Sequence, residues 1–174
     1  KEEVAKQTEV AKKRREKVEK LSIQMVQALA NTIDAKDTYT NGHSTRVAKY
    51  SMMLAKRMGY EGEKLETLYY AALLHDIGKI AIPNEIISKY GLLSNKERSI
   101  MNKHTEYGKE ILGSIDTEFM KIASEIAYEH HEHYDGSGNN KKSGEEINMY
   151  ARIVAVADVF DALTTRRSYK EAWS

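Results

Sequence analysis

Six histidines and a set of carboxylates are the residues of this chain that could do chemistry. Imidazole is a good ligand for first-row transition metals, and carboxylates add oxygen ligands that can bridge two ions. Two ions about 3.5–4 Å apart can hold a water or hydroxide for in-line attack at phosphorus. The histidines lie in the contexts Gly42-His43-Ser44, Leu74-His75-Asp76, Lys103-His104-Thr105 and Glu129-His130-His131-Glu132-His133.

Each of these residues also has an ordinary structural explanation when taken alone. His75-Asp76 follows an apolar helix face, where an ionised Asp needs a partner because burying a bare carboxylate is unfavourable. A metal would be such a partner, but many His-Asp pairs are accidents of the surface. Lys79 lies four residues after His75, so on a continuing helix it would face the same way and could hold a phosphate oxygen or balance charge.

The other candidates are equally open when considered one by one. Adjacent helical residues point about 100° apart, so His130 and His131 reach one cluster only if their helix end lies against it. His104 and His43 could be packed or surface residues. Asp158 interrupts an apolar helix and could bind a metal, cap a helix or pair with Arg152, although six residues is a poor helical spacing for that pair.

Composition narrows the class of protein. The 174 residues suit one domain with an appended element, and the net charge of +1 gives no reason to expect DNA binding. The absence of Cys excludes disulfides, thiolate nucleophiles and Cys-held metals, and it fits a cytoplasmic location. No apolar run approaches the ~20 residues of a membrane span. Because the chain begins with Lys1, we expect a piece of a longer protein that could be tethered to a membrane elsewhere.

A long helix over residues 1–36 precedes the histidines. It lacks Gly and Pro and is rich in Lys, Glu, Ala and Gln. Val4, Ala11, Val18 and Met25 recur at seven-residue spacing, but the second seam is half polar, so the coiled-coil pattern is weak. We interpret the segment as a linker or signalling helix, a candidate for homodimerisation and for connection to an upstream sensor domain or signalling protein. Its basic run at residues 12–15 is interpreted as a solvated face.

Shorter helices are expected to position the histidines. One opens at His43 and ends at Gly59. A second carries an apolar stripe into His75-Asp76, and the capping box Ser94–Glu97 opens a third through about Leu112. A fourth ends near His131, and residues 135–147 form a loop with a candidate small hairpin. Residues 149–163 are apolar nearly all round, which predicts a buried central helix.

Taken together and in order, these stretches resemble the HD-GYP family, a branch of the HD-domain phosphohydrolases. The resemblance runs from about Asp37 to Lys170. The matching stretches are residues 40–48, 74–80, 82–87, 101–104, 130–138 and 151–170, which include Leu74-His-Asp-Ile-Gly-Lys-Ile80, His130-His-Glu132 and Ala151-Arg-Ile-Val-Ala-Val-Ala-Asp158.

The resemblance implies an all-α HD-domain helical bundle over residues 37–174 and hydrolysis of the bacterial messenger cyclic di-GMP to pGpG, GMP or both. It implies two divalent transition-metal ions, iron or manganese, with attack by a hydroxide that bridges them and with Asp76 as a bridging ligand. Lys79 and Asp76 are the implied catalytic residues, and Lys79, Arg167 and Lys170 the implied phosphate contacts. Asp161 is a candidate proton donor by proximity alone. The implied metal ligands are His43, His75, Asp76, His104, His130, His131 and Asp158, with His133 outside the set.

Two departures from the family pattern bear on function. Gly138-Asn139-Asn140 stands where the family has Gly-Tyr-Pro, in a loop tied to substrate access and partner contacts. Tyr39 occupies the position where some members carry a Glu that helps to hold a third metal, so two metals are expected. The alternatives are a catalytically weak module that binds a cyclic dinucleotide or a protein, an HD phosphohydrolase for another nucleotide, and a helical signalling adaptor that would leave the histidines unexplained.

Overall fold

The computed structural model describes residues 2–37 and 41–165, and all regular secondary structure in these ranges is helical. The predicted all-α fold is therefore confirmed. The elements are α1 (Glu2–Lys36), α2 (His43–Arg57), α3 (Glu63–Leu73), the 3₁₀ helix η1 (Ile77–Ala81), α4 (Asn84–Ile87), α5 (Asn95–Asn102), α6 (His104–Gly113), α7 (Glu118–Glu129), the 3₁₀ helix η2 (Gly144–Glu146) and α8 (Met149–Thr164).

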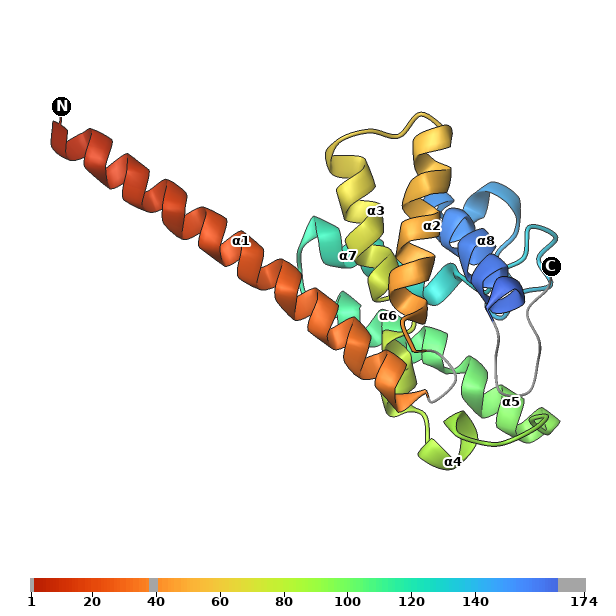
Figure 1. Cartoon of the computed structure of the whole chain (residues 1–174). Helices are drawn as coiled ribbons and strands as arrows, with labels where there is room; N and C mark the ends of the chain where they lie inside the picture. Colours follow the sequence, from red (N-terminus) through yellow and green to blue (C-terminus); the bar gives the residue numbers. More distant parts are fainter. Residues whose placement is uncertain (1, 38–40, 166–174) are drawn as a thin grey trace.

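A bundle of helices forms the body of the molecule (Figure 1). α2 packs against α3 and α8, and α6 packs against α7 and η1. The core between them is aliphatic, with Leu68, Leu73, Ile126 and Val154 fully buried. Burial of such side chains contributes about 1.5–3 kcal/mol each. This packing brings the ends of α2, α3, α6 and α7 and the middle of α8 to one place.

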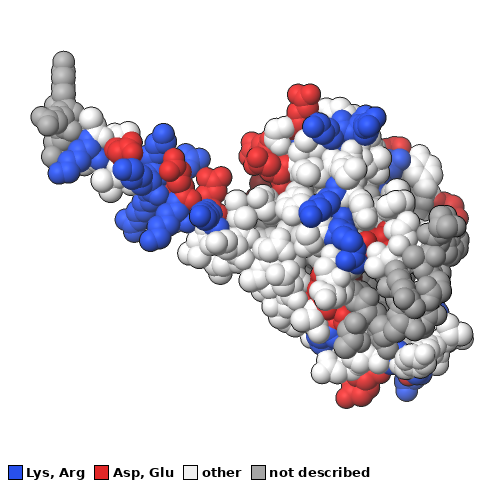
Figure 2. Space-filling model, in the orientation of Figure 1, with Lys and Arg blue, Asp and Glu red and all other residues white. Residues whose placement is uncertain are grey.

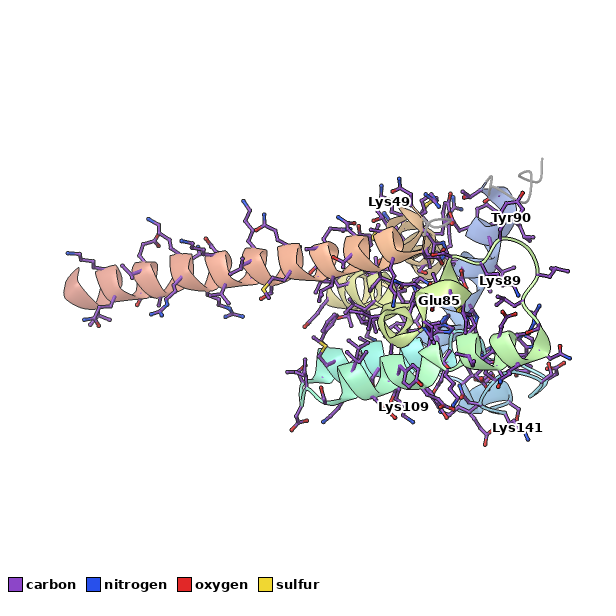
Figure 3. The ribbon with its side chains drawn as sticks, turned by 90° about the horizontal axis from the view of Figure 1, so that it is seen from below. Lys49, Glu85, Lys89, Tyr90, Lys109 and Lys141 are labelled. Atoms are coloured by element: carbon purple, nitrogen blue, oxygen red, sulfur yellow. The ribbon has the colours of Figure 1, made fainter. Side chains whose placement is uncertain are left out.

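α1 has two different halves. Its second half packs against α2, α3 and η1 through Val26, Ala30 and Ile33. Its first half projects far beyond the bundle in both Figure 1 and the perpendicular view of Figure 3. The Lys and Arg side chains of residues 12–15 are exposed there. Figure 2 shows blue side chains gathered on the projecting helix. No helix in the described ranges is both long and apolar enough to cross a membrane.

The chain breaks its helix between α3 and η1, earlier than the sequence predicts. α3 ends at Leu73, and His75 and Asp76 lie in a turn before η1 begins at Ile77. The prediction of a helix that continues to Lys79 is therefore wrong. Gly78 explains the change, because a Cβ there would lie 1.9 Å from the carbonyl oxygen of His104. Close contact of η1 with α6 requires a residue without a side chain.

Two further predictions need correction. α8 is not a buried central helix, because Val156, Val159 and Phe160 are 50–60% exposed. Only one side of α8 packs on the bundle, and Phe160 lies edge-on to Tyr50 of α2. The candidate hairpin at residues 135–147 is also wrong, since this described stretch contains turns and η2 and has no strand.

We predict that Gly78→Ala destabilises the protein strongly. The added Cβ meets backbone atoms of His104 and Gly108, which cannot move without shifting α6. The expected loss is about 3 kcal/mol or more, or a fall in Tm of roughly 6–12 °C for a domain of this size.

Gly113→Ala is the matched control, because a Cβ there meets nothing closer than 4.0 Å. It should leave the free energy of unfolding unchanged or raise it by up to ~1 kcal/mol. Thermal unfolding followed by circular dichroism measures both variants. Equal melting of Gly78→Ala and wild type would contradict the close contact.

Candidate metal centre

The seven implied ligands converge from five places in the fold. His43 is the first residue of α2, and His104 is the first residue of α6. His130 is the C-cap of α7, followed by His131. The remaining ligands are His75 and Asp76, in the turn after α3, and Asp158, on α8. Five of them, His43, His75, Asp76, His104 and His130, are buried.

Their donor atoms form two groups of three with Asp76 between them. His43, His75 and Asp158 make one group, and His104, His130 and His131 make the other. Within each group the donor atoms lie within 4.8 Å of one another.

The carboxylate of Asp76 faces both groups. Its Oδ2 atom lies 3.4 Å from His75 Nε2 and 3.9 Å from His43 Nε2. Its Oδ1 atom lies 3.3 Å from His104 Nε2 and 3.8 Å from His130 Nε2. One oxygen thus points to each group, which is the arrangement that a carboxylate bridging two ions requires.

The outer ring nitrogens of four histidines are held by oxygen acceptors. Nδ1 of His75 lies 2.7 Å from the carbonyl oxygen of Ala72, and Nδ1 of His104 lies 2.7 Å from that of Met101. Nδ1 of His130 lies 3.0 Å from the carbonyl oxygen of Ala127. Nδ1 of His43 lies 2.8 Å from Asp161 Oδ2. A carbonyl or carboxylate partner requires Nδ1 to carry the proton, so in the neutral rings Nε2 presents its lone pair inward.

These inward atoms lack protein partners suited to them. Nε2 of His75 is buried with no hydrogen-bond partner in the structure. Nε2 of His104 and Nε2 of His130 face each other at 3.4 Å, although acceptor partners occupy both Nδ1 atoms. Buried polar atoms are normally satisfied. Two divalent ions, one in each group, would use all of these lone pairs, so the residues present fit the pair of ions that the family resemblance implies.

Burial favours the neutral imidazoles that bind metals. It lowers the pKa of His104 to about 4 and also lowers the pKa values of His130 and His131. Asp76, in contrast, keeps its charge although it is buried. Burial works against the charged form, but Lys79 and the surrounding histidines hold the pKa of Asp76 well below the usual range. The centre therefore combines neutral nitrogen donors with an ionised carboxylate.

Asp161 supports His43 from behind. Its fully buried carboxylate accepts hydrogen bonds from Arg46 Nε at 2.6 Å and Arg46 Nη2 at 3.1 Å, besides its contact with His43 Nδ1. Burial opposes its charge, yet the bonds from His43 and Arg46 lower the pKa of Asp161. An ionised Asp161 that accepts from His43 and Arg46 carries no proton for a leaving group, which argues against that sequence-based suggestion.

The pKa of His43, in contrast to those of His104, His130 and His131, is raised, to about 9. Burial opposes the charged ring, but hydrogen bonds to Asp158 and Asp161 outweigh that effect. Nε2 of His43 lies 3.3 Å from Asp158 Oδ1. A cation bound between His43 and Asp158 would satisfy the same carboxylate that the proton satisfies.

Lys79 lies at the edge of the centre in a buried ionic cluster. Its Nζ atom lies 2.8 Å from Asp76 Oδ2 and 3.1 Å from Asp37 Oδ2. Burial disfavours its charge, but the two carboxylates raise its pKa above the usual value. Arg167 and Lys170, the other implied phosphate contacts, lie outside the described residues, as does Tyr39.

The altered loop is fixed to the rim of the centre. The carboxylate of Glu132 accepts hydrogen bonds from the backbone amides of Asn140 and Lys142, at 2.7 and 2.8 Å. A Cβ on Gly138 would lie 2.9 Å from the carbonyl oxygen of His131. The loop therefore packs directly on a candidate ligand. His133 is exposed, its Nδ1 atom lies 2.8 Å from Ser137 Oγ, and the metal-binding groups do not include it.

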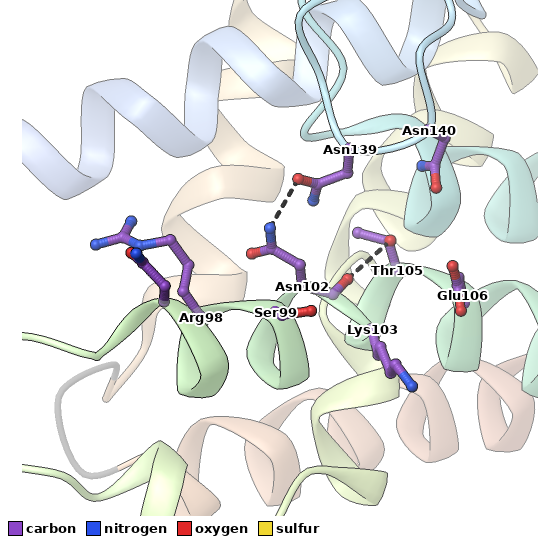
Figure 4. Close-up of a pocket in the computed structure, with 9 residues that line it drawn as sticks. Arg98, Ser99, Asn102, Lys103, Thr105, Glu106, Asn139 and Asn140 are labelled. Atoms are coloured by element: carbon purple, nitrogen blue, oxygen red, sulfur yellow. Dashed lines mark hydrogen bonds between the residues drawn. The ribbon is translucent and has the colours of Figure 1, made fainter.

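A polar cavity of about 370 Å³ lies between this loop and the α5–α6 junction (Figure 4). Asn102 donates a hydrogen bond to Asn139 Oδ1 at 3.0 Å across it. Arg98, Lys103 and Glu106 line the same cavity. The Gly-Asn-Asn loop thus adds two amide side chains to the lining of this cavity, at the positions where the family pattern has Tyr and Pro.

Comparisons with known proteins agree with this geometry. A family model described as "HD domain" matches residues 27–174. A Vibrio cholerae protein named "3'3'-cGAMP-specific phosphodiesterase 2" is 45% identical over 154 residues, covering 88% of this chain and 30% of that protein. The Xanthomonas campestris "Cyclic di-GMP phosphodiesterase response regulator RpfG" is 40% identical over 158 residues, covering 90% of this chain and 42% of that protein. The chain spans less than half the length of either relative.

Solved structures show the same fold. The "HDG"Y"P protein" Bd1817 from Bdellovibrio bacteriovorus superposes with a TM-score of 0.61 at 24% identity, over 70% of this chain and 40% of that one. A Vibrio cholerae cyclic GMP-AMP phosphodiesterase, V-cGAP3, superposes with a TM-score of 0.63 at 17% identity, over 81% of this chain and 40% of that one. At these identities the likeness concerns the arrangement of helices.

Asp161→Asn should weaken metal binding without unfolding the protein. The Asn amide can donate to Nδ1 of His43, which permits the tautomer with the proton on Nε2 and no inward lone pair. The substitution also removes the negative charge that orients the ring. Loss of such an outer partner typically reduces metal affinity about 10–100-fold. Competition of Mn²⁺ against a chromophoric chelator measures the effect.

Thr165→Val is the matched control, because Thr165 donates to Asp161 Oδ1 at 3.1 Å without touching His43. It should bind Mn²⁺ within about twofold of wild type, since the contacts of Asp161 with His43 and Arg46 stay in place. The same affinity in Asp161→Asn and wild type would rule out the supporting role of Asp161.

Proposed function

The chain belongs to the HD-domain family, and we propose that it is the metal-dependent phosphodiesterase domain of a longer protein and hydrolyses a cyclic dinucleotide. The observation that carries this proposal is the position of Asp76, with one carboxylate oxygen directed at each group of three candidate ligands. A surface His-Asp pair would not be buried with four imidazole nitrogens within 4 Å of the Asp carboxylate. A binding module has no physical need for two groups of metal-ligand donors.

The proposed metal ligands are the seven residues His43, His75, Asp76, His104, His130, His131 and Asp158. Nitrogen and oxygen donors of this kind suit iron or manganese, and we propose two such ions. When bound, a pair of divalent ions supplies Lewis-acid polarisation of a phosphoryl group and compensates its developing negative charge. The protein contributes fixed ring orientations through the acceptors on the four Nδ1 atoms.

Lys79 is the proposed contact to a nonbridging phosphate oxygen. An ammonium has three donors, and Asp76 and Asp37 engage two of them. Its charge is secured by the same two carboxylates, so it can offset negative charge on phosphorus at neutral pH. Arg167 and Lys170 are proposed to hold the second phosphate, where Arg can bind two oxygens at once.

Cyclic di-GMP is the proposed substrate, with pGpG, GMP or both as products. A second candidate, 3'3'-cGAMP, is favoured by one observation. The relative at 45% identity is named as specific for it. We propose a cytoplasmic location for this domain, in keeping with a nucleotide messenger as substrate.

α1 is proposed to be the connection between this domain and an upstream sensor or signalling partner, and a dimerisation helix. The apolar side chains of Val18, Leu21, Met25 and Leu29 are exposed on its surface. They recur at three- and four-residue spacing, as in a coiled-coil seam. A second copy of α1 would bury them.

Replacement of either central ligand should abolish turnover. His75→Ala and Asp76→Ala are each expected to lower the hydrolysis of cyclic di-GMP or 3'3'-cGAMP by at least ~100-fold, with fewer than two metals bound per chain. The protein is purified without oxygen, its iron and manganese are counted, and products are separated by chromatography.

His133→Ala is the control, because this exposed histidine is outside the candidate ligand set. It should retain the metals and the activity of wild type. A metal-loaded wild-type protein that binds cyclic dinucleotides without hydrolysing them would favour the binding-module alternative. Hydrolysis of another nucleotide, with no hydrolysis of cyclic dinucleotides, would favour the alternative of an HD phosphohydrolase with a different substrate.

Leu21→Glu should convert a dimer into a monomer. The added carboxylates would repel each other across the seam, while the bundle stays intact because Leu21 is exposed. Sedimentation velocity over a range of concentrations measures the change. A wild-type protein that is monomeric throughout that range would contradict dimerisation through α1.

A further inference from the structure

The C-terminal end of α1 makes hydrogen bonds to two segments beside the candidate metal centre, namely η1 and the start of α2. The contacts are made by Asp34 and Lys36 in the last turn of α1 and by Asp37 directly after it. Their partners lie in the stretch after Asp76 and at the start of α2, beside His43. None of the three is a candidate ligand.

Lys36 holds the backbone of η1. Its Nζ atom donates to the carbonyl oxygens of Lys79 at 3.1 Å, Ile80 at 2.6 Å and Ile82 at 2.8 Å. The last carbonyls of a helix have no partner within the helix, and a Lys side chain can satisfy them. Three donors meet three acceptors, so the ammonium fixes the end of η1 from a residue more than forty positions earlier in the chain.

Asp37 holds the side chain of Lys79. Its buried carboxylate accepts from Lys79 Nζ at 3.1 Å, on the side away from Asp76. Lys79 is thus held at its backbone by Lys36 and at its ammonium by Asp37. The last residue of α1 and the residue after it together determine where the proposed phosphate contact lies.

Asp34 holds the start of α2. Its buried carboxylate accepts from Ser44 Oγ at 2.6 Å and from the Ser44 amide at 3.2 Å. The residue before α2 is Gly42, whose position has no side-chain cap. Asp34 therefore satisfies a helix N-terminus from another helix and fixes the residue that follows His43.

The opposite end of α1 extends away from the bundle (Figures 1 and 3). α1 is 35 residues long, without Gly or Pro. A helix of that length spans roughly 50 Å and behaves as a stiff rod. One end is open to other contacts, while the other end is bonded to the centre.

We propose that Lys36 and Asp37 are positioning residues that make α1 part of the active centre, so that a displacement of α1 moves Lys79. The functional consequence rests on the proposed phosphodiesterase activity, whereas the mechanical part does not. A purely structural anchor would stabilise the whole domain equally. The proposed role predicts effects concentrated in residues 77–82 and in the binding of substrate.

Lys36→Met tests the position of Lys79. Met keeps much of the aliphatic stem but removes all three donors. Hydrogen–deuterium exchange should rise at the amides of Lys79 and Ile82, and KM for the cyclic dinucleotide should rise about 10-fold with kcat within about twofold of wild type, because a binding contact is weakened. The metal content should not change.

Lys20→Met is the control, an exposed Lys on the projecting part of α1, and should match wild type in every measurement. Lys36→Arg should recover part of the KM, because Arg keeps the charge and the donors. A uniform fall in Tm with normal exchange at residues 77–82 and normal KM would overturn the proposal. If wild type hydrolyses no cyclic dinucleotide, the exchange measurement alone still supports or overturns the positioning of η1.

A cross-link tests the transmission of movement. Ser22 of α1 and Thr67 of α3 line one cavity of about 390 Å³, and the chain has no Cys of its own. Ser22→Cys with Thr67→Cys, joined by a bismaleimide, restrains α1 against the bundle. We expect KM to shift at least threefold relative to the same variant capped with N-ethylmaleimide, and the shift to vanish when Lys36→Met is added. No shift, or the same shift without Lys36, would overturn the transmission.

Discussion

A single buried carboxylate, that of Asp76, organises this protein. Only 4% of the residue is exposed, and an unpaired carboxylate in such a place is strongly unfavourable. Its two oxygens are shared among four imidazole nitrogens and the ammonium of Lys79. The surrounding fold supplies these partners from α2, the turn after α3, α6, the end of α7 and η1. α3 stops at Leu73, and Gly78 lets η1 approach α6 closely enough to bring His104 to Asp76.

Around this carboxylate the structure separates two tasks. Nitrogen and oxygen donors face inward, while acceptors behind them fix the orientation of each ring. Three of those acceptors are backbone carbonyls three positions earlier in the chain, in α3, α5 and α7. His43 is the exception, because its Nδ1 atom contacts a side chain. A carboxylate from α8 replaces the missing carbonyl, and Arg46 in turn stabilises that carboxylate.

The regions that could tune the site are distinct from the donors. The Gly-Asn-Asn loop is fixed by Glu132 and faces a polar cavity, so it can differ among relatives without disturbing the buried nitrogens. α1 contacts the opposite side, through Lys79 and Ser44. Substrate choice and control by other parts of a longer protein can thus change independently of the metal ligands. This division agrees with a family whose named members act on more than one cyclic dinucleotide.

The sequence by itself determined most of the helices, the capping box at Ser94 and, through the ordered resemblance, which residues meet at the centre. These features depend on local signals, namely apolar periodicity, caps, Gly positions and residue types at short spacing. It also contained Asp161, three positions after Asp158, but nothing local distinguishes a proton donor from a buried support for His43. The break after Leu73 was missed because its cause is a contact between Gly78 and a distant helix.

Only the tertiary structure decided the roles of Lys36, Asp161 and the exposed face of α8. Lys36 meets Lys79, and His43 meets Asp161, across 43 and 118 positions of sequence. Apolar composition alone could not show that one side of α8 lies at the surface, because burial depends on which helices happen to cover it. Pairings over such distances are determined by packing of the whole bundle, and no short-range pattern encodes them.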